Sequence, residues 1–353
     1  MAQIDSLLLE VLQRRGSDLH FVAGDPPRIR LYGDLSALKP EKLAPEAVKQ
    51  ALYEIMPKGA LERFEAKDGA DFAYTLADRG RFRVNVMRQL NGMGAVFRAI
   101  PSKALTLEDL KMPEAVRQMC RANNGLILVT GKTGSGKSTT LAAMVDDINR
   151  RVKGHILTVE DPIEFVHERK NCLISQREIG VHSPSFAAAL HSALREDPDV
   201  ILVGELRDLE TMSIAVTAAE MGILVMGTLH TNGAAQTVDR MVNVFPSDKQ
   251  SHVRTMLSTS LRGVVSQQLV QRADKQGRIA ALEILVNTPA CGNLIRQGKL
   301  DQLENTMQVG GQFGMRTMDT AIQQLLEQRQ ITGREAYKKA INKLKFEELK
   351  DSG

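Results

Sequence analysis

The feature that most constrains this chain is a glycine-rich stretch, GKTGSGKS, at residues 131–138. An apolar run at residues 126–129 precedes it and predicts a buried strand, and apolar residues at helical spacing follow it. A strand, a glycine-rich loop and a helix in this order are typical of a phosphate-binding loop. The alternative is a turn with a surface lysine, but the loop pattern arises by chance in only about 1% of chains this long.

We expect this loop to bind the phosphates of ATP through backbone N–H groups, aided by the positive end of the helix that follows. Lys137 should reach the β- and γ-phosphates, and Ser138 should ligate Mg²⁺. The residues expected to contact the nucleotide are Gly131, Thr133, Gly134, Ser135, Gly136, Lys137, Ser138 and Thr139.

The composition limits the kind of partner that this chain can bind. Its 353 residues are enough for two domains, and its net charge is only +4, with acidic and basic residues interspersed. With no Trp and only four Tyr, it is poorly supplied with side chains that stack on single-stranded nucleic acid. We therefore expect no nucleic-acid partner.

The cysteines and the N-terminal segment indicate a cytoplasmic location. Cys120, Cys172 and Cys291 are widely spaced and form no CxxC pair, which argues against a cysteine-based zinc site and fits a reduced compartment. The opening MAQIDSLLLE predicts an amphipathic helix rather than a signal peptide, because Asp5 and Glu10 interrupt its apolar pattern. No apolar run approaches the roughly 20 residues that a membrane-spanning helix needs.

Residues 1–100 have the pattern of a smaller α+β domain. Strands are predicted at SDLHFV, PPRIRLYGDL, DFAYTL and RFRVNVMRQL, and an Asn-Gly turn signal introduces another at NGMGAVFRAI. Residues 45–66 have helical spacing. A linker and a helix are expected at residues 101–118, with LTLEDLKMPEAVRQMC predicted to be helical.

Residues 119–353 have the pattern of an α/β domain that ends in helices. The apolar segments LILVT, HILTVE, VILVGE and GILVMGTLH alternate with helical ones. Near-continuous apolar strands are buried on both faces, so the sequence predicts a mostly parallel sheet flanked by helices. Ligands bind at the carboxyl ends of the strands in such sheets.

Polar residues follow these apolar strands, and they match what ATP hydrolysis needs: metal neutralisation, a positioned water and a sensor of the γ-phosphate. They are Glu160, Asp161 and Glu164 after one strand, Glu205, Arg207 and Asp208 after the next, and His230 after a third. Each has a structural alternative, since acidic residues after strands often cap helices and a lone histidine often makes structural hydrogen bonds. Because Gly204 stands where a metal-directed aspartate is expected, Glu205 would act alone on Mg²⁺, through a bound water.

The segment RGRFRVNVMRQ in the first domain alternates strictly, which places Arg81, Arg83 and Asn85 on one face of a strand. Arg98 follows on the adjacent predicted strand. This row is either a solvated sheet face or a set of guanidinium groups aimed at nucleotide across a domain cleft. Permanent charge and bidentate geometry suit arginine to the second role.

Several of these segments carry a resemblance to a known family. They are SDLHFVAGDPPRIR, GLILVTGKTGSGKSTTLAAM, ILTVEDPIEFVHE, SALREDPDVILVGELRDLET and GTLHTNGAAQTVDR. With them the chain resembles the PilT family of type IV pilus retraction motors, within the secretion ATPase superfamily, over nearly its whole length. The resemblance implies an N-terminal PAS-like domain, a C-terminal RecA-like P-loop ATPase domain, a homohexameric ring, and ATP bound between the two domains. It also implies work on pilin subunits through the inner-membrane platform protein, from the cytoplasmic side.

The resemblance also implies roles for individual residues. Glu164, in TVEDPIEF, matches the position of the family's catalytic glutamate, and Glu205 matches the Walker B position. His230 matches the second histidine of the family's histidine box, whereas Ile223 stands where a first histidine is usual. Arg83 and Arg98 match positions where arginines of the superfamily contact nucleotide.

This sequence lacks the four-cysteine zinc motif of type II secretion and pilus extension ATPases, which favours the retraction branch. Within that branch two readings stay open: a primary retraction motor, or a PilU-like accessory ATPase that works with a paralogous retraction ATPase. A nucleic-acid translocase is disfavoured by the weak charge. A non-hydrolysing scaffold is disfavoured by intact Lys137, Ser138, Glu164 and Glu205.

The segment TPACGNLIRQGK departs from its counterpart in the family. Retraction motors resemble A-I-R-x-L-I-R here, but Cys291 replaces the isoleucine and Gly292 replaces the first arginine. Leu294 and Ile295 are expected to pack a helix that survives these changes. Loss of a cation at position 292 is expected to affect coupling to the pilus machinery rather than hydrolysis.

Overall fold

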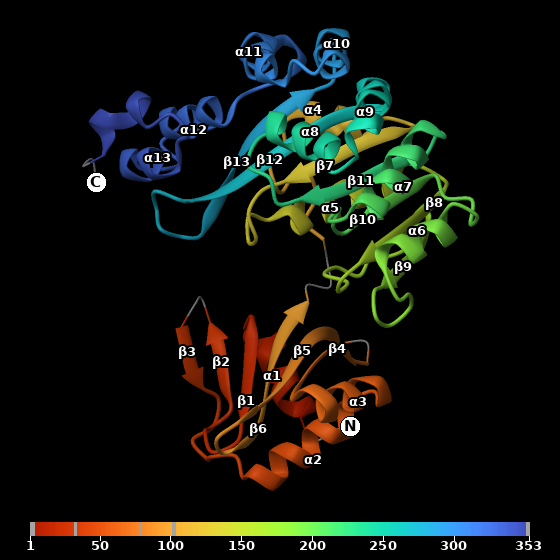
Figure 1. The fold of residues 1–353 in the computed structure, drawn as a ribbon. Helices are drawn as coiled ribbons and strands as arrows, with labels where there is room; N and C mark the ends of the chain where they lie inside the picture. Colours follow the sequence, from red (N-terminus) through yellow and green to blue (C-terminus); the bar gives the residue numbers. More distant parts are fainter. Residues whose placement is uncertain (1–3, 32–33, 78, 101–103, 351–353) are drawn as a thin grey trace. The chain divides into compact units, whose positions relative to one another are not determined.

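Figure 1 shows the computed structural model of the chain, which describes residues 4–31, 34–77, 79–100 and 104–350. The chain forms two compact units. The first comprises Met1–Lys103 and Glu164–Val166, and the second comprises Ala104–Ile163 and His167–Gly353. Each unit has its own sheet and its own hydrophobic core.

The first unit contains a six-stranded antiparallel sheet. In sheet order its strands are β3 (Asp34–Ala37), β2 (Arg28–Leu31), β1 (Asp18–Val22), β6 (Gly92–Ile100), β5 (Gly80–Gln89) and β4 (Gly69–Leu76). Its helices are α1 (Asp5–Gln13), α2 (Pro45–Ile55) and α3 (Lys58–Lys67). The predicted alternation in β5 is confirmed, because Phe82, Val84 and Val86 are buried in the core whereas Arg83 and Asn85 are exposed.

Two segments of this unit are divided where the sequence analysis predicted one element. The predicted helix at residues 45–66 is two helices, because Pro57 has no N–H to continue α2 and instead occupies the N-cap of α3. The segment PPRIRLYGDL forms parts of two antiparallel strands, in which Arg28 pairs with Ala37 and Leu31 pairs with Asp34. The single strand predicted there is therefore wrong.

The second unit contains a seven-stranded mixed sheet that is parallel except for one edge strand. In sheet order the strands are β13 (Arg278–Val286), β12 (Leu261–Gln271), β7 (Gly125–Thr130), β11 (Leu224–Leu229), β10 (Val200–Val203), β8 (His155–Glu160) and β9 (Leu173–Glu178). The antiparallel strand is β13. The α/β fold class and the mostly parallel sheet predicted from the apolar runs are confirmed.

Helices cover both faces of this sheet, because successive residues of each strand point to opposite sides. Leu126 and Leu128 of β7 pack in the cluster that contains residues of α6 to α9, whereas Ile127 and Val129 pack in the cluster that contains residues of α4 and α5. These helices are α4 (Glu114–Cys120), α5 (Lys137–Arg151), α6 (Phe186–Ala193), α7 (Leu209–Glu220), α8 (Ala234–Asn243) and α9 (Ser247–Ser260).

The last helices, α12 (Met318–Glu327) and α13 (Gly333–Lys339), pack around the end of the β12–β13 hairpin (Figure 1), whereas buried residues of α10 and α11 belong to the core that contains residues of α6 to α9. Val270 of β12 and Ala281 of β13 share a small core with Met318, Ile322 and other residues of the terminal segment. The helical elements of this region are α10 (Pro289–Gln297), η1 (Leu300–Gln302), α11 (Leu303–Val309), η2 (Gly310–Phe313), α12 (Met318–Glu327), α13 (Gly333–Lys339) and η3 (Lys343–Leu349). None of the helices in the described ranges is long and apolar enough to cross a membrane.

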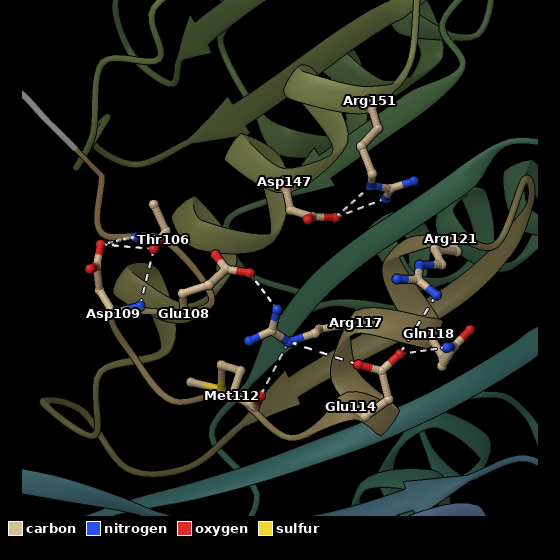
Figure 2. A network of polar contacts seen from close by, with 10 residues as sticks. All are labelled: Thr106, Glu108, Asp109, Met112, Glu114, Arg117, Gln118, Arg121, Asp147 and Arg151. Atoms are coloured by element: carbon tan, nitrogen blue, oxygen red, sulfur yellow. Dashed lines mark hydrogen bonds and ion pairs between the residues drawn. The ribbon is translucent and has the colours of Figure 1, made fainter.

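The segment that opens the second unit is only partly helical, so the continuous helix predicted for LTLEDLKMPEAVRQMC is wrong in its first half. Thr106 and Asp109 exchange hydrogen bonds in a tight turn, and Pro113 restricts the chain before α4 begins (Figure 2). Arg117 of α4 then bonds to Glu108 in that turn.

This opening segment is also tied to the helix that follows the glycine-rich loop. Arg151, in the last turn of α5, donates a hydrogen bond of 2.9 Å from Nη2 to the carbonyl oxygen of Cys120 at the end of α4. Its guanidinium group also pairs with Asp147 one turn earlier, as Figure 2 shows. The two helices on this face of the sheet are therefore joined by polar contacts as well as by apolar packing.

Candidate nucleotide-binding site

The carboxyl ends of the central strands lie in register. Thr130, the last residue of β7, pairs with Leu229 of β11 on one side and with Ser266 of β12 on the other. The residues that follow, Gly131 and His230, therefore leave the sheet side by side. This places the glycine-rich loop at the edge where the strand-end rule predicted it.

The backbone of the loop presents N–H groups that suit a phosphate ligand. Gly131 and Gly136 have φ values of 138° and 90°, which are accessible mainly to glycine. Gly136 occupies the N-cap of α5, and no side chain caps this helix. The first N–H groups of α5 are thus left for a ligand, at the positive end of a 15-residue helix.

Lys137, Ser138 and Ser135 carry polar side chains in the loop and in the first turn of α5. Lys137 Nζ donates to the carbonyl oxygens of Gly131 at 2.9 Å and Lys132 at 3.3 Å, so its ammonium group is held over the loop. Ser138 is half-buried in the first turn of α5. The hydroxyl of Ser135 is buried and has no hydrogen-bond partner in the part of the chain that the structure describes. An orphaned buried hydroxyl in this loop fits a ligand with acceptor oxygens.

The three other loop residues expected at the nucleotide are placed as follows. Thr133 and Gly134 are exposed at the tip of the loop, and Thr139 is half-buried in α5. Their contacts with nucleotide stay predictions.

The sequence analysis missed Gln267, whose side chain forms a hydrogen bond to the backbone of the loop. Gln267 of β12 is only 3% exposed, and its Nε2 donates to the carbonyl oxygen of Ser135 at 2.6 Å. Its Oε1 accepts a hydrogen bond of 2.8 Å from the hydroxyl of Thr140. A signal was present in the sequence, because polar residues inside a strand buried on both faces need buried partners.

Two predicted site residues come into contact at the ends of neighbouring strands. His230 Nε2 lies 3.1 Å from Oε1 of Glu205, and Arg207 Nε lies 2.6 Å from the same oxygen. Burial raises the pKa of Glu205, but the hydrogen bond from Arg207 and the nearby His230 outweigh it and lower the pKa overall. Glu205 is therefore ionised at neutral pH.

The capping alternative does not hold for Glu205. The N-cap of the following helix, α7, is Asp208, which accepts a hydrogen bond of 2.8 Å from the N–H of Thr211. Gly204 lies close to β8, and a Cβ there would come within 3.2 Å of the carbonyl oxygen of Val159. A side chain at position 204 would therefore press against the backbone of β8.

The structure places the acidic residues after β8 in different surroundings. Glu160 is buried, and its Oε1 accepts hydrogen bonds from Thr158 at 2.7 Å and Gln176 at 3.3 Å. Asp161 and Glu164 are exposed in the loop that follows β8. The role of Glu164 as the catalytic base stays a prediction.

In the first unit, Arg83 and Arg98 are direct partners on neighbouring strands. Arg98 donates from Nε to Oδ1 of Asp18 at 2.9 Å, and Arg83 Nε lies 3.8 Å from Oδ1 of Asp71. Burial raises the pKa of Asp18, but hydrogen bonds from Ser17 and Arg98 outweigh it and lower the pKa overall. An ionised, buried Asp18 therefore orients the guanidinium group of Arg98.

This chain is similar in sequence and in structure to known proteins. The sequence matches the type II/IV secretion system protein family over residues 1–346. It is 49% identical over 337 residues to the type IV pilus retraction ATPase PilT of Pseudomonas aeruginosa, covering 96% of this chain and 98% of that protein. The type IV pilus ATPase PilU of the same organism is 39% identical over 334 residues, covering 95% of this chain and 87% of PilU. The crystal structure of the pilus retraction motor PilT with bound ADP matches with a TM-score of 0.92 and 41% identity, over 99% of this chain and 100% of that one.

Proposed function

Because this chain belongs to the type II/IV secretion system protein family and is an ATPase, we propose that it powers the retraction of type IV pili. The observation that carries this proposal is the complete phosphate loop, with Lys137 over it and Glu205 and His230 in contact at the adjacent strand ends. A relative named for pilus retraction is similar in sequence to this chain over 98% of the relative's length. This similarity supports a role in pilus retraction for this chain.

Each site residue has a role in the proposed reaction. Lys137 binds the β- and γ-phosphates, and Glu164 accepts a proton from the attacking water. Ser138 and, through a water, Glu205 would hold Mg²⁺, which when bound neutralises charge on the phosphate oxygens. Hydroxyl and carboxylate oxygens suit this hard cation. The described contacts of Glu205 with Arg207 and His230 both use Oε1.

The arginines and the histidine also have roles in the proposed reaction. Arg83 and Arg98 stabilise the charge that develops on the transferred phosphate, and His230 senses its presence through Glu205. The structure groups no three or more His, Cys, Asp and Glu side chains into a cation site within the described ranges.

The proposal extends to assembly and partners. The chain forms a homohexameric ring, acts on the inner-membrane pilus platform protein from the cytoplasmic side, and works beside a paralogous retraction ATPase where one is present. A head-to-tail contact must close into a ring or grow into a fibre. Mass measurement with Mg²⁺ and a non-hydrolysable nucleotide, at about tens of micromolar protein, should give six subunits, and a monomer would contradict the ring.

A PilU-like accessory ATPase is the second candidate function, and the altered α10 segment at Cys291 and Gly292 favours it. The difference in identity, 49% to PilT against 39% to PilU, favours the primary motor.

Imaging of labelled pili in a deletion strain tests the proposal. Complementation with the wild-type gene should restore retraction, and Lys137→Ala, expressed at the same level, should not. Normal retraction in strains that lack both this gene and any paralogue would refute the proposal. Restoration only when the paralogue is present would assign the accessory role.

A further inference from the structure

The amide of Gln267 reaches from strand β12 of the sheet to the backbone of the glycine-rich loop. We infer that Gln267 is a positioning residue, which sets the orientation of the peptide between Ser135 and Gly136 and through it the affinity of the loop for nucleotide phosphates. This inference rests on nucleotide binding by the loop and does not depend on pilus retraction.

Two neighbours fix the direction of the Gln267 amide. The carbonyl oxygen of Ser135 can only accept a hydrogen bond, so the NH₂ end of the amide must face it, at 2.6 Å. The oxygen end then faces Thr140, whose hydroxyl donates to it at 2.8 Å. All three residues are buried, with exposures of 3% for Gln267, 6% for Ser135 and 1% for Thr140, so water does not compete for these bonds.

The hydrogen bond to Ser135 determines where the next N–H group points. In a trans peptide the carbonyl oxygen of one residue and the N–H of the next lie on opposite sides of the peptide unit. With the Ser135 carbonyl held toward β12, the N–H of Gly136 must point away from β12, to the ligand side of the loop. Gly136 is the N-cap of α5, so this N–H lies at the positive end of the helix.

The packing around Gln267 leaves the loop little freedom to find another arrangement. A Cβ at Gly136 would lie 2.7 Å from Nε2 of Gln267, and a Cβ at Gly131 would overlap the main-chain oxygen of Gln267. Strand β12 itself is held between β7 and β13. The amide therefore acts from a rigid strand on a loop that fits closely around it.

The chain offers a matched control beside the test residue. Gln268 is the next residue of β12 and points to the opposite face of the sheet. Gln267→Met removes both hydrogen bonds at nearly constant volume, and Gln268→Met makes the same change where the loop is not touched. Gln267→Glu instead sets a carboxylate against the Ser135 carbonyl, which should turn the peptide over.

The experiment measures equilibrium binding of ADP to the full-length protein, and separately the thermal midpoint without nucleotide. We expect Gln267→Met to weaken ADP binding roughly fivefold to twentyfold, as the loss of two buried hydrogen bonds predicts. Gln267→Glu should weaken it further, whereas Gln268→Met should match the wild type. The KM for ATP should rise with the ADP dissociation constant while kcat changes by less than about threefold.

A double-variant comparison separates positioning from general stability. Thr140→Val should weaken ADP binding in the wild-type background but not in Gln267→Met, because its partner is already gone. Wild-type ADP affinity in folded Gln267→Met, an equal loss in Gln268→Met, or additive effects of Thr140→Val and Gln267→Met would each overturn the inference. If Gln267→Glu fails to fold, Gln267→Met decides the outcome alone.

Discussion

The imidazole Nε2 of His230 and the carboxylate Oε1 of Glu205 lie 3.1 Å apart, although 25 residues separate them in the sequence. They meet because β10 and β11 are parallel neighbours, with Val203 aligned with Gly227. Arg207 contacts the same oxygen at 2.6 Å. The carboxylate proposed to act on the metal-bound water thus contacts two nitrogen atoms through a single oxygen.

The first prediction concerns the pH dependence of turnover. The pKa of Glu205 in the folded protein is lowered, so its interactions stabilise the fold above the unfolded-state pKa and are lost as pH falls through the folded pKa. Removing the Arg207 hydrogen bond in Arg207→Gln should raise the pKa of Glu205. The acid limb of the kcat/KM profile, measured from about pH 3 to about pH 7, should then move toward higher pH.

Arg207→Lys is the control for this prediction, since it keeps a cation near Glu205 and should leave most of the profile in place. An unchanged acid limb in Arg207→Gln would show that the ionisation of Glu205 does not limit turnover at low pH.

The second prediction separates nucleotide binding from hydrolysis. Lys137→Ala removes the ammonium group from the loop, so ATP affinity and turnover should both fall. Glu164→Gln keeps the shape of the side chain but removes the proposed base, so ATP should bind with wild-type affinity while kcat drops by about 10²–10⁴-fold. Glu168→Gln, in the same exposed loop, should behave as the wild type. Equal turnover by Glu164→Gln and the wild type would move the role of base to Glu205.

The sequence alone could predict the phosphate loop of this site but not the role of Gln267. The phosphate loop is local, so Lys137 and Ser138 could be assigned from spacing and flanking elements. Gln267 acts on Ser135 across 132 residues of sequence, and the QQ pair in VVSQQLV does not show which glutamine faces the loop. The structure settles that choice, because Gln267 lies on the same face of β12 as Val265, which packs in the cluster that contains residues of α5.

The same limit explains the errors in the fold prediction. Helical spacing continues through residues 45–66 and through LTLEDLKMPEAVRQMC, but a proline interrupts each segment. Pro57 and Pro113 are local signals that outweigh periodicity: Pro57 divides the first segment into α2 and α3, and Pro113 precedes α4. The alternation in β5, which no proline interrupts, was predicted residue by residue.

The third prediction concerns the arginines of the first unit. Arg83→Lys and Arg98→Lys keep the charge but lose the guanidinium fork, and each should lower turnover at least about tenfold with the ring still assembled. Asp18→Asn should reproduce part of the Arg98→Lys effect, because Asp18 holds Arg98 Nε at 2.9 Å. Arg63→Lys, an exposed position in α3, is the control. Wild-type turnover in both arginine variants would support the alternative that these arginines lie on a solvated sheet face and do not act on nucleotide.

The last prediction concerns α10 and the residues that depart from the family pattern. Cys291 and Gly292 are both buried in this helix, and a Cβ at Gly292 would lie 2.7 Å from the carbonyl oxygen of Ser258 in α9. Gly292 is thus a site of close contact between α10 and α9, and it also stands where the family pattern has an arginine. Gly292→Ala should lower the free energy of unfolding by about 1–3 kcal/mol, measured by denaturant unfolding, because the two helices must move apart. An unchanged free energy of unfolding would show that α9 can shift to make room for the added methyl group at little cost.

The close contact between α10 and α9 also affects the result expected when an arginine is placed at position 292. Asn293→Arg is the control, since it adds a cation at an exposed position beside Gly292. In a deletion strain, the wild type should restore retraction, and Cys291→Ile/Gly292→Arg should do no better, because the arginine would force α10 away from α9. The ATPase rate of the folded double variant should stay within about threefold of the wild type, as its phosphate loop is intact. Retraction restored by the double variant but not by an ATP-hydrolysing wild type would contradict the primary-motor role and assign the accessory one.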